Sequence, residues 1–225
     1  MFGQSPGLIL ASRSPRRREL MGLLQIPFHA VAADVTESIL AGEPPAATAA
    51  RLAQCKARAV AARHPGALVA GFDTLVALGE TVLGKPADAA EARDMLRRMR
   101  DRPHTVYSGV TLTGSGSEVT QVAETQVWMR DYTNEELEAY VAGGDPFDKA
   151  GGYAIQHPQF QPVARWAGCY ANVMGLPLCH LARLLQAWEL RPPVDVPAAC
   201  QRHTGQRCEV FVILQELGEH PPQRL

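Results

Sequence analysis

Hydrophobic and polar positions along the chain follow two periods, one typical of strands and one typical of helices. The apolar run "GLIL" at residues 7–10 predicts a short buried strand. Residues 15–24 then place leucines at helical spacing. Ser14 followed by Pro15 is typical of a helix start, with the serine hydroxyl as N-cap and proline at the first helical position. The chain is therefore predicted to open with a strand, a turn and a helix.

The alanine-rich residues 48–63 predict a second helix, because alanine has the highest helix propensity. Leu52, Cys55 and Ala59 mark its buried stripe, and Lys56 lies beside that stripe. The "HPG" that follows is typical of a helix end.

Two pairs of β-rich runs follow. Residues 67–84 hold two runs joined through Gly79 and Glu80, the pattern of a tight hairpin. Residues 104–114 and 118–130 form the second pair, separated by the turn-forming "SGS". Both pairs predict antiparallel strands.

Three further helices are predicted. Residues 88–99 are amphipathic, and the next helix begins at a capping box made by Thr133 and Glu136 and ends at a pair of glycines. Residues 175–190 are expected to form the last core helix. Helices that alternate with strand pairs predict an α/β fold with a mixed, partly antiparallel sheet flanked by helices.

The organisation of the chain is expected to be one domain over residues 1–190 and an extension over residues 191–225. The boundary is the "RPPVDVP" stretch, whose prolines interrupt regular structure. At 225 residues, the chain is long enough to bury a sizeable core.

The charge balance excludes a strong overall basic or acidic field. Lys and Arg number 22 and Asp and Glu 23, for a net charge of −1, so we expect neither a nucleic-acid partner nor an anionic membrane partner. No apolar run approaches the roughly 20 residues that span a bilayer, and the first residues lack a charged leader with an apolar core. We expect a cytoplasmic protein whose five cysteines, an odd number, are reduced thiols.

The "SRSPRRREL" stretch places an unusual cluster of arginines at a helix start. The first turn of a helix carries partial positive charge, so each exposed cation there is disfavoured by about 0.3–1 kcal/mol. Free backbone N–H groups, guanidinium forks and a hydroxyl together suit phosphate oxygens. We therefore predict an anion opposite this turn, the alternative being a solvated basic turn. The residues concerned are Ser12, Arg13, Arg16, Arg17 and Arg18.

Asp73 lies inside the apolar run "LVAGFDTLVAL", where a carboxylate needs a partner to offset its desolvation. The hairpin returns Lys85, in "LGKP", toward the Asp73 end of the same strand. A site is one interpretation, and the other is a backbone-capping aspartate with a surface lysine.

The "DKAGGYAIQ" stretch places Lys149 before two glycines and ends at Gln156, whose amide both donates and accepts hydrogen bonds. Such an amide suits the edge of a nucleobase. The alternative is an ordinary surface glutamine on a turn.

Taken together, the ordered segments "LASRSPRRREL", "DVTES", "GFDT" with "LGKP", "DKAGGYAIQ" and "NVMGLPL" resemble the Maf family of nucleoside triphosphate pyrophosphatases. The resemblance covers roughly residues 7–188. It implies an inosine-triphosphatase-like fold with two lobes around a central cleft, and a homodimer. It also implies metal-assisted cleavage of a nucleoside triphosphate between its α and β phosphates.

The same resemblance implies roles for single residues. Asp73 matches the proton acceptor that activates the attacking water, and Glu37 of "DVTES" matches an acid that helps to bind metal. Ser12, Arg16, Lys56 and Lys85 match groups that hold the phosphate chain. Arg16, Thr74 and Gln156 match positions that distinguish the subfamily acting on dTTP and UTP. The resemblance therefore implies dTTP, UTP or modified pyrimidine nucleotides as substrates, the alternative being the same reaction on 7-methyl-GTP.

The predicted metal is Mg²⁺ or Mn²⁺, because Asp73 and Glu37 offer hard oxygen ligands. In the extension, Cys200, His203 and Cys208 form at most a partial metal site, and an ordered extension is the preferred interpretation.

Competing interpretations remain for the function. The chain is either this hydrolase, a non-catalytic nucleotide sensor, or a nucleic-acid-binding protein, and a role in restraining cell division is compatible with the first two. Two departures from the family pattern affect the base preference more than the reaction. Phe72 stands where the family has a small residue, and His157 and Pro158 follow Gln156.

Overall fold

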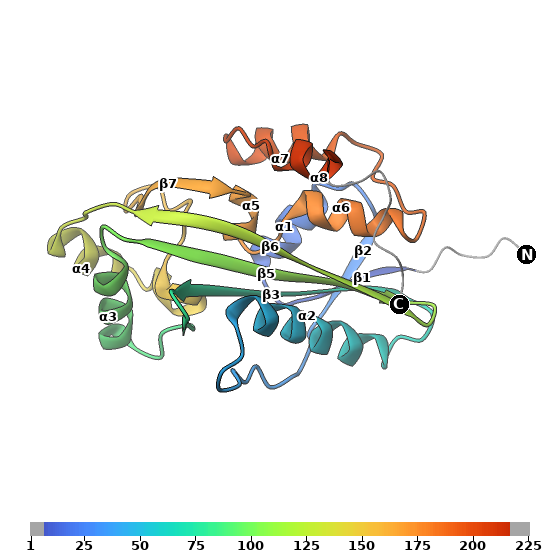
Figure 1. Cartoon of the computed structure of the whole chain (residues 1–225), viewed down its shortest axis with the longest axis horizontal. Coiled ribbons are helices and arrows are strands. Elements are labelled where there is room, and N and C mark those ends of the chain that lie inside the picture. Colours follow the sequence, from blue (N-terminus) through green and yellow to red (C-terminus); the bar gives the residue numbers. More distant parts are fainter. Residues whose placement is uncertain (1–6, 217–225) are drawn as a thin grey trace, which may run out of the picture.

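A seven-stranded mixed sheet forms the centre of the computed structural model, which describes residues 7–216 (Figure 1). The strand order is β2-β1-β3-β5-β6-β7, and β4 pairs with β3. The strands are β1 (Leu8–Ala11), β2 (Phe28–Val31), β3 (Leu68–Leu78), β4 (Thr81–Leu83), β5 (Pro103–Gly114), β6 (Ser117–Met129) and β7 (Val163–Gly168). The α-helices are α1 (Pro15–Gly22), α2 (Pro45–Ala61), α3 (Ala89–Met99), α4 (Asn134–Ala142), α5 (Tyr170–Val173), α6 (Leu178–Gln186), α7 (Val196–Thr204) and α8 (Val210–Glu216), and the 3-10 turns are η1 (Asp145–Asp148) and η2 (Ala150–Gly152).

The predicted mixed α/β fold is confirmed. β1 runs parallel to β2 and β3, and the remaining pairs are antiparallel. Both predicted hairpins are present. In the second one, Ser115 and Gly116 have φ values of 53° and 77°, the positive angles that a tight two-residue hairpin turn requires.

Three clusters of buried apolar side chains hold the layers together. One joins β1 and β3 to α1, α6 and α7, and a second joins the other end of the sheet to α3 and α4. The third lies under α2, which covers the opposite face of the sheet (Figure 1).

The side of α2 that faces the sheet differs from the predicted one. Cys55 and Ala59 are only half-buried, so the predicted stripe was wrong in its phase. The residues that face the sheet are Thr48, Ala49, Leu52, Ala53, Lys56, Ala57 and Val60. Small side chains predominate there because the helix lies very close to β3 and β5. Lys56, expected beside the stripe, is therefore at its centre.

Two glycines permit this close approach of α2. A Cβ atom at Gly71 of β3 would lie 2.7 Å from the backbone nitrogen of Ala57, and one at Gly109 of β5 would lie 2.9 Å from that of Ala50. Real side chains do not tolerate such distances to backbone. The two glycines therefore fix the height of α2 above the sheet.

The extension packs on the main body of the chain. Val196 and Cys200 of α7 are buried in the same cluster as α6, so residues 175–190 do not hold the last core helix as predicted. Sequence periodicity also missed β2 and β7. Both strands lie at the edges of the sheet and carry mostly exposed or half-buried side chains, which gives them no clear apolar pattern.

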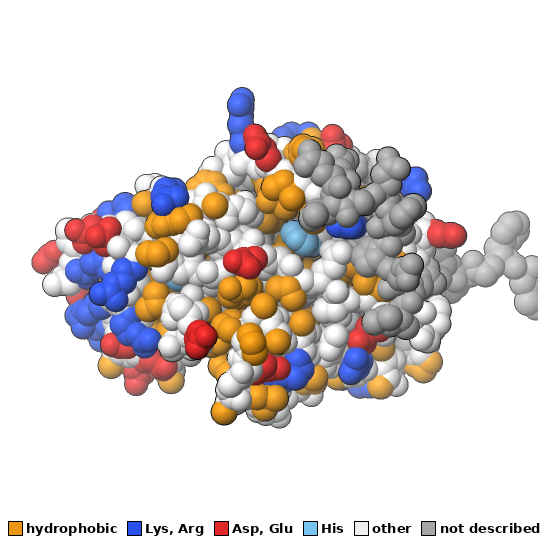
Figure 2. Space-filling model, in the orientation of Figure 1, with side chains coloured by type: hydrophobic (Ala, Val, Ile, Leu, Met, Phe, Trp, Pro, Cys, Tyr) orange, Lys and Arg blue, Asp and Glu red, His pale blue; other side chains and the backbone are white. Residues whose placement is uncertain are grey.

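Basic side chains over α3 and α4 lie among acidic ones, as the face in Figure 2 shows. Arg93 contacts Glu138 at 2.7 Å, and Arg98 contacts Asp94 at 3.5 Å. Within residues 7–216, no helix is long and apolar enough to cross a membrane.

We predict that Gly109→Ala destabilises the fold by about 3 kcal/mol, because the added methyl group meets the backbone of α2. Gly22→Ala is the matched control, since a Cβ there meets nothing within 4 Å, and its effect should stay within about 0.5 kcal/mol. Urea unfolding of both variants measures the difference. Equal stability of the two variants would contradict the close contact.

Candidate active site

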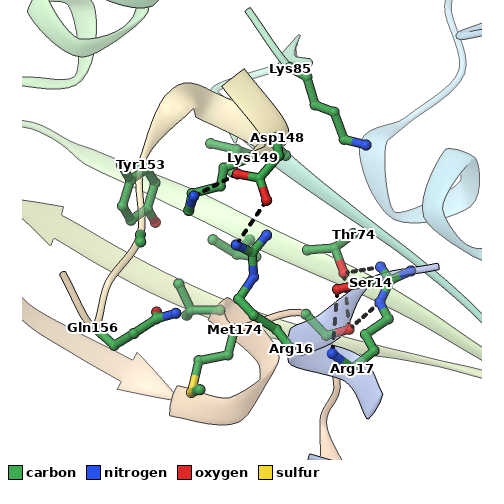
Figure 3. A pocket seen from close by; sticks show the side chains of 16 residues that line it. Ser14, Arg16, Arg17, Thr74, Lys85, Asp148, Lys149, Tyr153, Gln156 and Met174 are labelled. Atoms are coloured by element: carbon green, nitrogen blue, oxygen red, sulfur yellow. Dashed lines mark hydrogen bonds and ion pairs between the residues drawn. The ribbon is translucent and has the colours of Figure 1, made fainter. Parts of the chain in front are cut away.

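Two adjoining cavities contain the predicted site residues except Arg18, which is exposed and lines neither cavity. The larger cavity, about 480 Å³, lies between the β1–α1 turn, α2 and β3. The smaller cavity, about 120 Å³, continues from it toward η2 and the segment after α5 (Figure 3). The larger cavity is lined by Ser12, Arg13, Arg16, Arg17, Glu37, Lys56, Asp73, Thr74 and Lys85. The smaller cavity adds Lys149 and Gln156 and shares Arg16, Arg17, Thr74 and Lys85.

A buried ion pair lies at the base of the larger cavity. Asp73 is 3% exposed and Lys56 is 7% exposed, and the Lys56 Nζ lies 2.5 Å from Asp73 Oδ1. The same ammonium group lies 2.6 Å from Glu37 Oε1. Asp73 Oδ2 is buried and has no hydrogen-bond partner among the described residues. One carboxylate oxygen at the cavity is therefore held by Lys56, and the other remains available.

Glu37 connects this ion pair to the cavity rim. Its burial favours the neutral acid, but the hydrogen bond and charge of Lys56, with the charges of Lys85 and Arg17, lower its pKa below the ordinary value. Glu37 is therefore ionised at neutral pH. Two carboxylates thus share one ammonium group, which leaves carboxylate oxygens to accept a further proton or cation.

The β1–α1 turn has the predicted helix start. The Ser14 hydroxyl accepts a hydrogen bond from the Arg17 backbone nitrogen at 3.4 Å. Ser12 Oγ accepts one from the Ser14 backbone nitrogen at 3.2 Å. Arg13 pairs with Asp34 at 2.6 Å, and Arg16 lies 3.4 Å from Asp148. These carboxylates offset part of the positive charge at the helix start.

Arg17 differs from the other arginines because its donors are used within the protein. Its guanidinium donates to the Gly175 carbonyl at 2.8 Å, to the Phe72 carbonyl at 3.1 Å and to Thr74 Oγ1 at 3.0 Å. These bonds join α1, β3 and the segment after α5. Arg17 therefore fixes the walls of both cavities.

The two remaining lysines differ in their freedom. Lys149 is buried and donates to the Asp145 carbonyl at 2.5 Å and to Asp148 Oδ1 at 2.6 Å, so it holds the η1 turn. Lys85 is exposed, extends toward the cavity in Figure 3, and makes no hydrogen bond or ion pair with any described residue. Of these lysines, Lys85 is the one free to meet an anion.

The smaller cavity has a mixed polar and apolar lining. The exposed side chain of Gln156 points into it, opposite Arg16 and beside Met174 (Figure 3). Tyr153 forms part of its wall, and its hydroxyl lies 2.7 Å from Nε2 of the buried His104. Burial lowers the pKa of His104 to about 4, so this imidazole is neutral at pH 7. The wall at Tyr153 is therefore uncharged.

Several lining residues were not predicted. Ser14, Tyr153, Met174 and Gly175 line the smaller cavity, although the "GYAIQ" and "NVMGLPL" segments that contain the last three were already recognisable. The sequence did not indicate a role for His104, because a histidine in a strand pattern gives no information about the residues packed against it. Such contacts depend on tertiary packing.

The two departures from the family pattern have local explanations. Phe72 is fully buried in the core beneath Arg17, whose guanidinium carbon lies 5.9 Å from the ring centroid. His157 Nδ1 accepts a hydrogen bond from the Phe160 backbone nitrogen at 2.9 Å, and its ring packs edge-on against Tyr140. His157 therefore fixes the turn directly after Gln156.

The donor set fits a divalent cation that arrives with a phosphorylated ligand. Within residues 7–216, no group of three or more His, Cys, Asp or Glu side chains is placed to hold a metal ion by itself. Mg²⁺ often uses one or two carboxylates and completes its coordination with substrate phosphates and water. The unpartnered Asp73 Oδ2 and nearby Glu37 supply those carboxylates.

The partial metal site in the extension is not formed. His203 Nε2 lies 3.6 Å from Glu19 Oε1 of α1, so the imidazole faces a carboxylate rather than the thiols of Cys200 and Cys208. Over its described residues, 191–216, the extension forms α7 and α8.

The sequence comparisons with known proteins agree on one family. The family model described as Maf-like protein matches residues 7–188. A dTTP/UTP pyrophosphatase from Myxococcus xanthus is 50% identical over 179 residues, which cover 80% of this chain and 91% of that protein. A dTTP/UTP pyrophosphatase from Salinibacter ruber is 46% identical, over 80% of this chain and 90% of that protein. Among solved structures, a HAM1 protein from Coxiella burnetii aligns with a TM-score of 0.43 and 13% identity, over 94% of this chain and 99% of that chain.

We predict that Lys56→Met destabilises the protein by about 3–5 kcal/mol, because it leaves the buried Asp73 without its countercharge. Asp73→Asn should cost less, since Lys56 keeps Glu37 as a partner. The double variant should be more stable than Lys56→Met alone. Urea unfolding at pH 7 measures all three.

The control for these variants is Asp94→Asn, which removes an exposed pair and should change stability by at most about 0.5 kcal/mol. Strictly additive effects of the two buried substitutions would contradict the ion pair.

Proposed function

Because this chain belongs to the Maf family, we propose that it hydrolyses dTTP and UTP to the nucleoside monophosphate and pyrophosphate. The observation that carries the proposal is a buried carboxylate with one unpartnered oxygen at the base of a cavity lined by cations. Relatives that share up to half of their residues with this chain are dTTP/UTP pyrophosphatases.

The triphosphate occupies the larger cavity in this proposal. The Lys85 ammonium group contacts the phosphate oxygens as a point charge. Arg13 and Arg16 contact them by exchanging their solvent-accessible carboxylate partners, Asp34 and Asp148, for phosphate. The hydroxyl of Ser12 and the backbone N–H groups at the start of α1 complete the contacts. Arg17 and Lys149, whose donors are used within the protein, act as positioning residues.

Asp73 acts as the general base. Its Oδ2 accepts the proton of a water that attacks the α-phosphorus in line with the leaving pyrophosphate. Lys56 holds Oδ1, which fixes the orientation of the carboxylate. Positive charge around the phosphate chain stabilises the charge that develops on the leaving group.

In the proposal, Glu37 and Asp73 would hold a divalent cation, Mg²⁺ or Mn²⁺, that arrives with the triphosphate. When bound, it supplies positive charge to the phosphate oxygens and lowers the pKa of water. Lys56 contacts both carboxylates, and its positive charge offsets the repulsion between them.

The nucleobase lies in the smaller cavity. Gln156 reads the donor and acceptor edge of the base, and Thr74 and Arg16 border the passage between base and phosphates. The predicted homodimer stays a prediction, because one chain supplies every residue named here.

The test is product analysis of the purified chain with dTTP, UTP, CTP, GTP and 7-methyl-GTP in the presence of Mg²⁺ or Mn²⁺. We expect monophosphate and pyrophosphate from dTTP and UTP. Asp73→Asn should lower kcat by about 10²–10⁴-fold, the usual contribution of a general base. Removal of the metal with a chelator should also abolish turnover.

Asp94→Asn serves as the control, since this carboxylate lies on the surface of α3 and should leave kcat unchanged. Nucleotide binding without any product would instead establish a sensor. Release of orthophosphate in place of pyrophosphate would contradict attack at the α-phosphorus.

A further inference from the structure

Four of the five cysteines surround one small space between the extension and the main body of the chain. Cys169, Cys179, Cys200 and Cys208 line this cavity, whose volume is only about 10 Å³. The fifth, Cys55, belongs to α2 on the opposite face of the sheet (Figure 1). A cavity of this size holds no nucleotide or cofactor, and the four thiols are not placed to hold a metal ion. The thiols are therefore available to one another.

The four thiols have different surroundings. Cys169 precedes α5 and is buried, Cys179 lies in α6 and Cys200 in α7. Burial raises the pKa of Cys179 to about 12 and that of Cys200 to about 11, so both stay protonated. Cys208 lies between α7 and α8 and is half-buried. Cys179 is half-buried as well, but its pKa is raised, whereas Cys208 lines the same cavity as Cys169 and interacts with it.

The interaction between Cys169 and Cys208 makes the Cys208 thiol the more reactive of the two. A hydrogen bond donated by the Cys169 thiol lowers the pKa of Cys208 to about 6, and the same contact raises the pKa of Cys169. At neutral pH, Cys208 is therefore largely a thiolate, which is the nucleophilic form of cysteine.

We propose that Cys208 and Cys169 are a reactive thiol pair that a small-molecule disulfide oxidises to an intramolecular disulfide, which fastens the extension to the body of the chain. The site takes an oxidant of the disulfide class, for which oxidised glutathione is the probe.

The reaction balances in two exchanges. The Cys208 thiolate attacks one sulfur of oxidised glutathione, whose S–S bond breaks and releases one glutathione thiolate, which takes up a proton. Cys169 then loses its proton, and its sulfur attacks Cys208 and displaces the second glutathione thiolate. Two protein thiols are oxidised by two electrons in total, and one glutathione disulfide is reduced to two thiols.

The disulfide would be coupled structurally to the candidate active site through α5, which begins directly after Cys169. The backbone nitrogen and carbonyl of Cys169 both bond to Thr125 Oγ1 at 3.0 Å, and Asn172 Nδ2 bonds to the same hydroxyl at 3.0 Å. Val173 and Met174, which follow, line the smaller cavity. The extension is thereby tied to the segment that forms this wall.

The experiment uses the full-length, fully reduced protein. It is incubated with oxidised glutathione at pH 7 and quenched with N-ethylmaleimide, and the disulfides are mapped by peptide mass spectrometry. We expect a peptide containing Cys169 joined to one containing Cys208. The oxidised protein should also unfold at a higher urea concentration than the reduced one, because the cross-link restricts the unfolded chain.

Cys208→Ser should abolish both the cross-link and the shift in urea midpoint, and the matched control Cys55→Ser should retain both. A second readout needs no variant. The rate of alkylation of Cys208 by iodoacetamide should rise with pH around a midpoint near 6. A cross-link between other cysteines, glutathione adducts without a cross-link, or an alkylation midpoint near that of a free thiol would each overturn the proposal.

Discussion

The buried ion pair between Lys56 and Asp73 is the interaction on which the rest of the site depends. Two charges removed from water are unfavourable unless they meet at close range with further partners, and here the Nζ–Oδ1 distance is 2.5 Å. That distance requires α2 to pack very close to the sheet. Gly71 and Gly109 allow this approach, and the small residues of α2 fill the contact. The close packing of α2 on the sheet is therefore what places Lys56 beside the candidate base Asp73.

Strand topology brings the phosphate-facing turn to the same place. β1 and β3 are parallel neighbours, with Ala11 paired to Gly71, so β1 ends in the β1–α1 turn where β3 reaches Asp73. β3 then continues past the end of β1 and forms its hairpin with β4, which returns the chain to Lys85. Arg17 joins these parts through carbonyls of β3 and of the segment after α5. A cleft at the end of parallel strands is a common place for ligands in α/β folds.

Sequence reasoning predicted much of this arrangement because the signals were local. Hairpin turns, the Ser14 cap and the capping box at Thr133 depend on a few neighbouring residues, and each is present. The buried side of α2 was wrong because alanine packs on either side of a helix, and only the glycines across the contact select one. The edge strands, the neutral His104 behind Tyr153 and the packing of α7 depend on long-range contacts that no local pattern records. Arg17 lines both cavities, but no local pattern indicated that its donors bond to protein carbonyls.

The most direct test of the account is the fate of the water oxygen. A single turnover of dTTP in ¹⁸O-labelled water, followed by mass spectrometry of both products, identifies the phosphorus that water attacks. Attack at the α-phosphorus by water bound at Asp73 predicts the label in the monophosphate and none in pyrophosphate. Label in pyrophosphate would place the attack at the β-phosphorus and contradict the proposed position of the triphosphate above the Lys56–Asp73 pair.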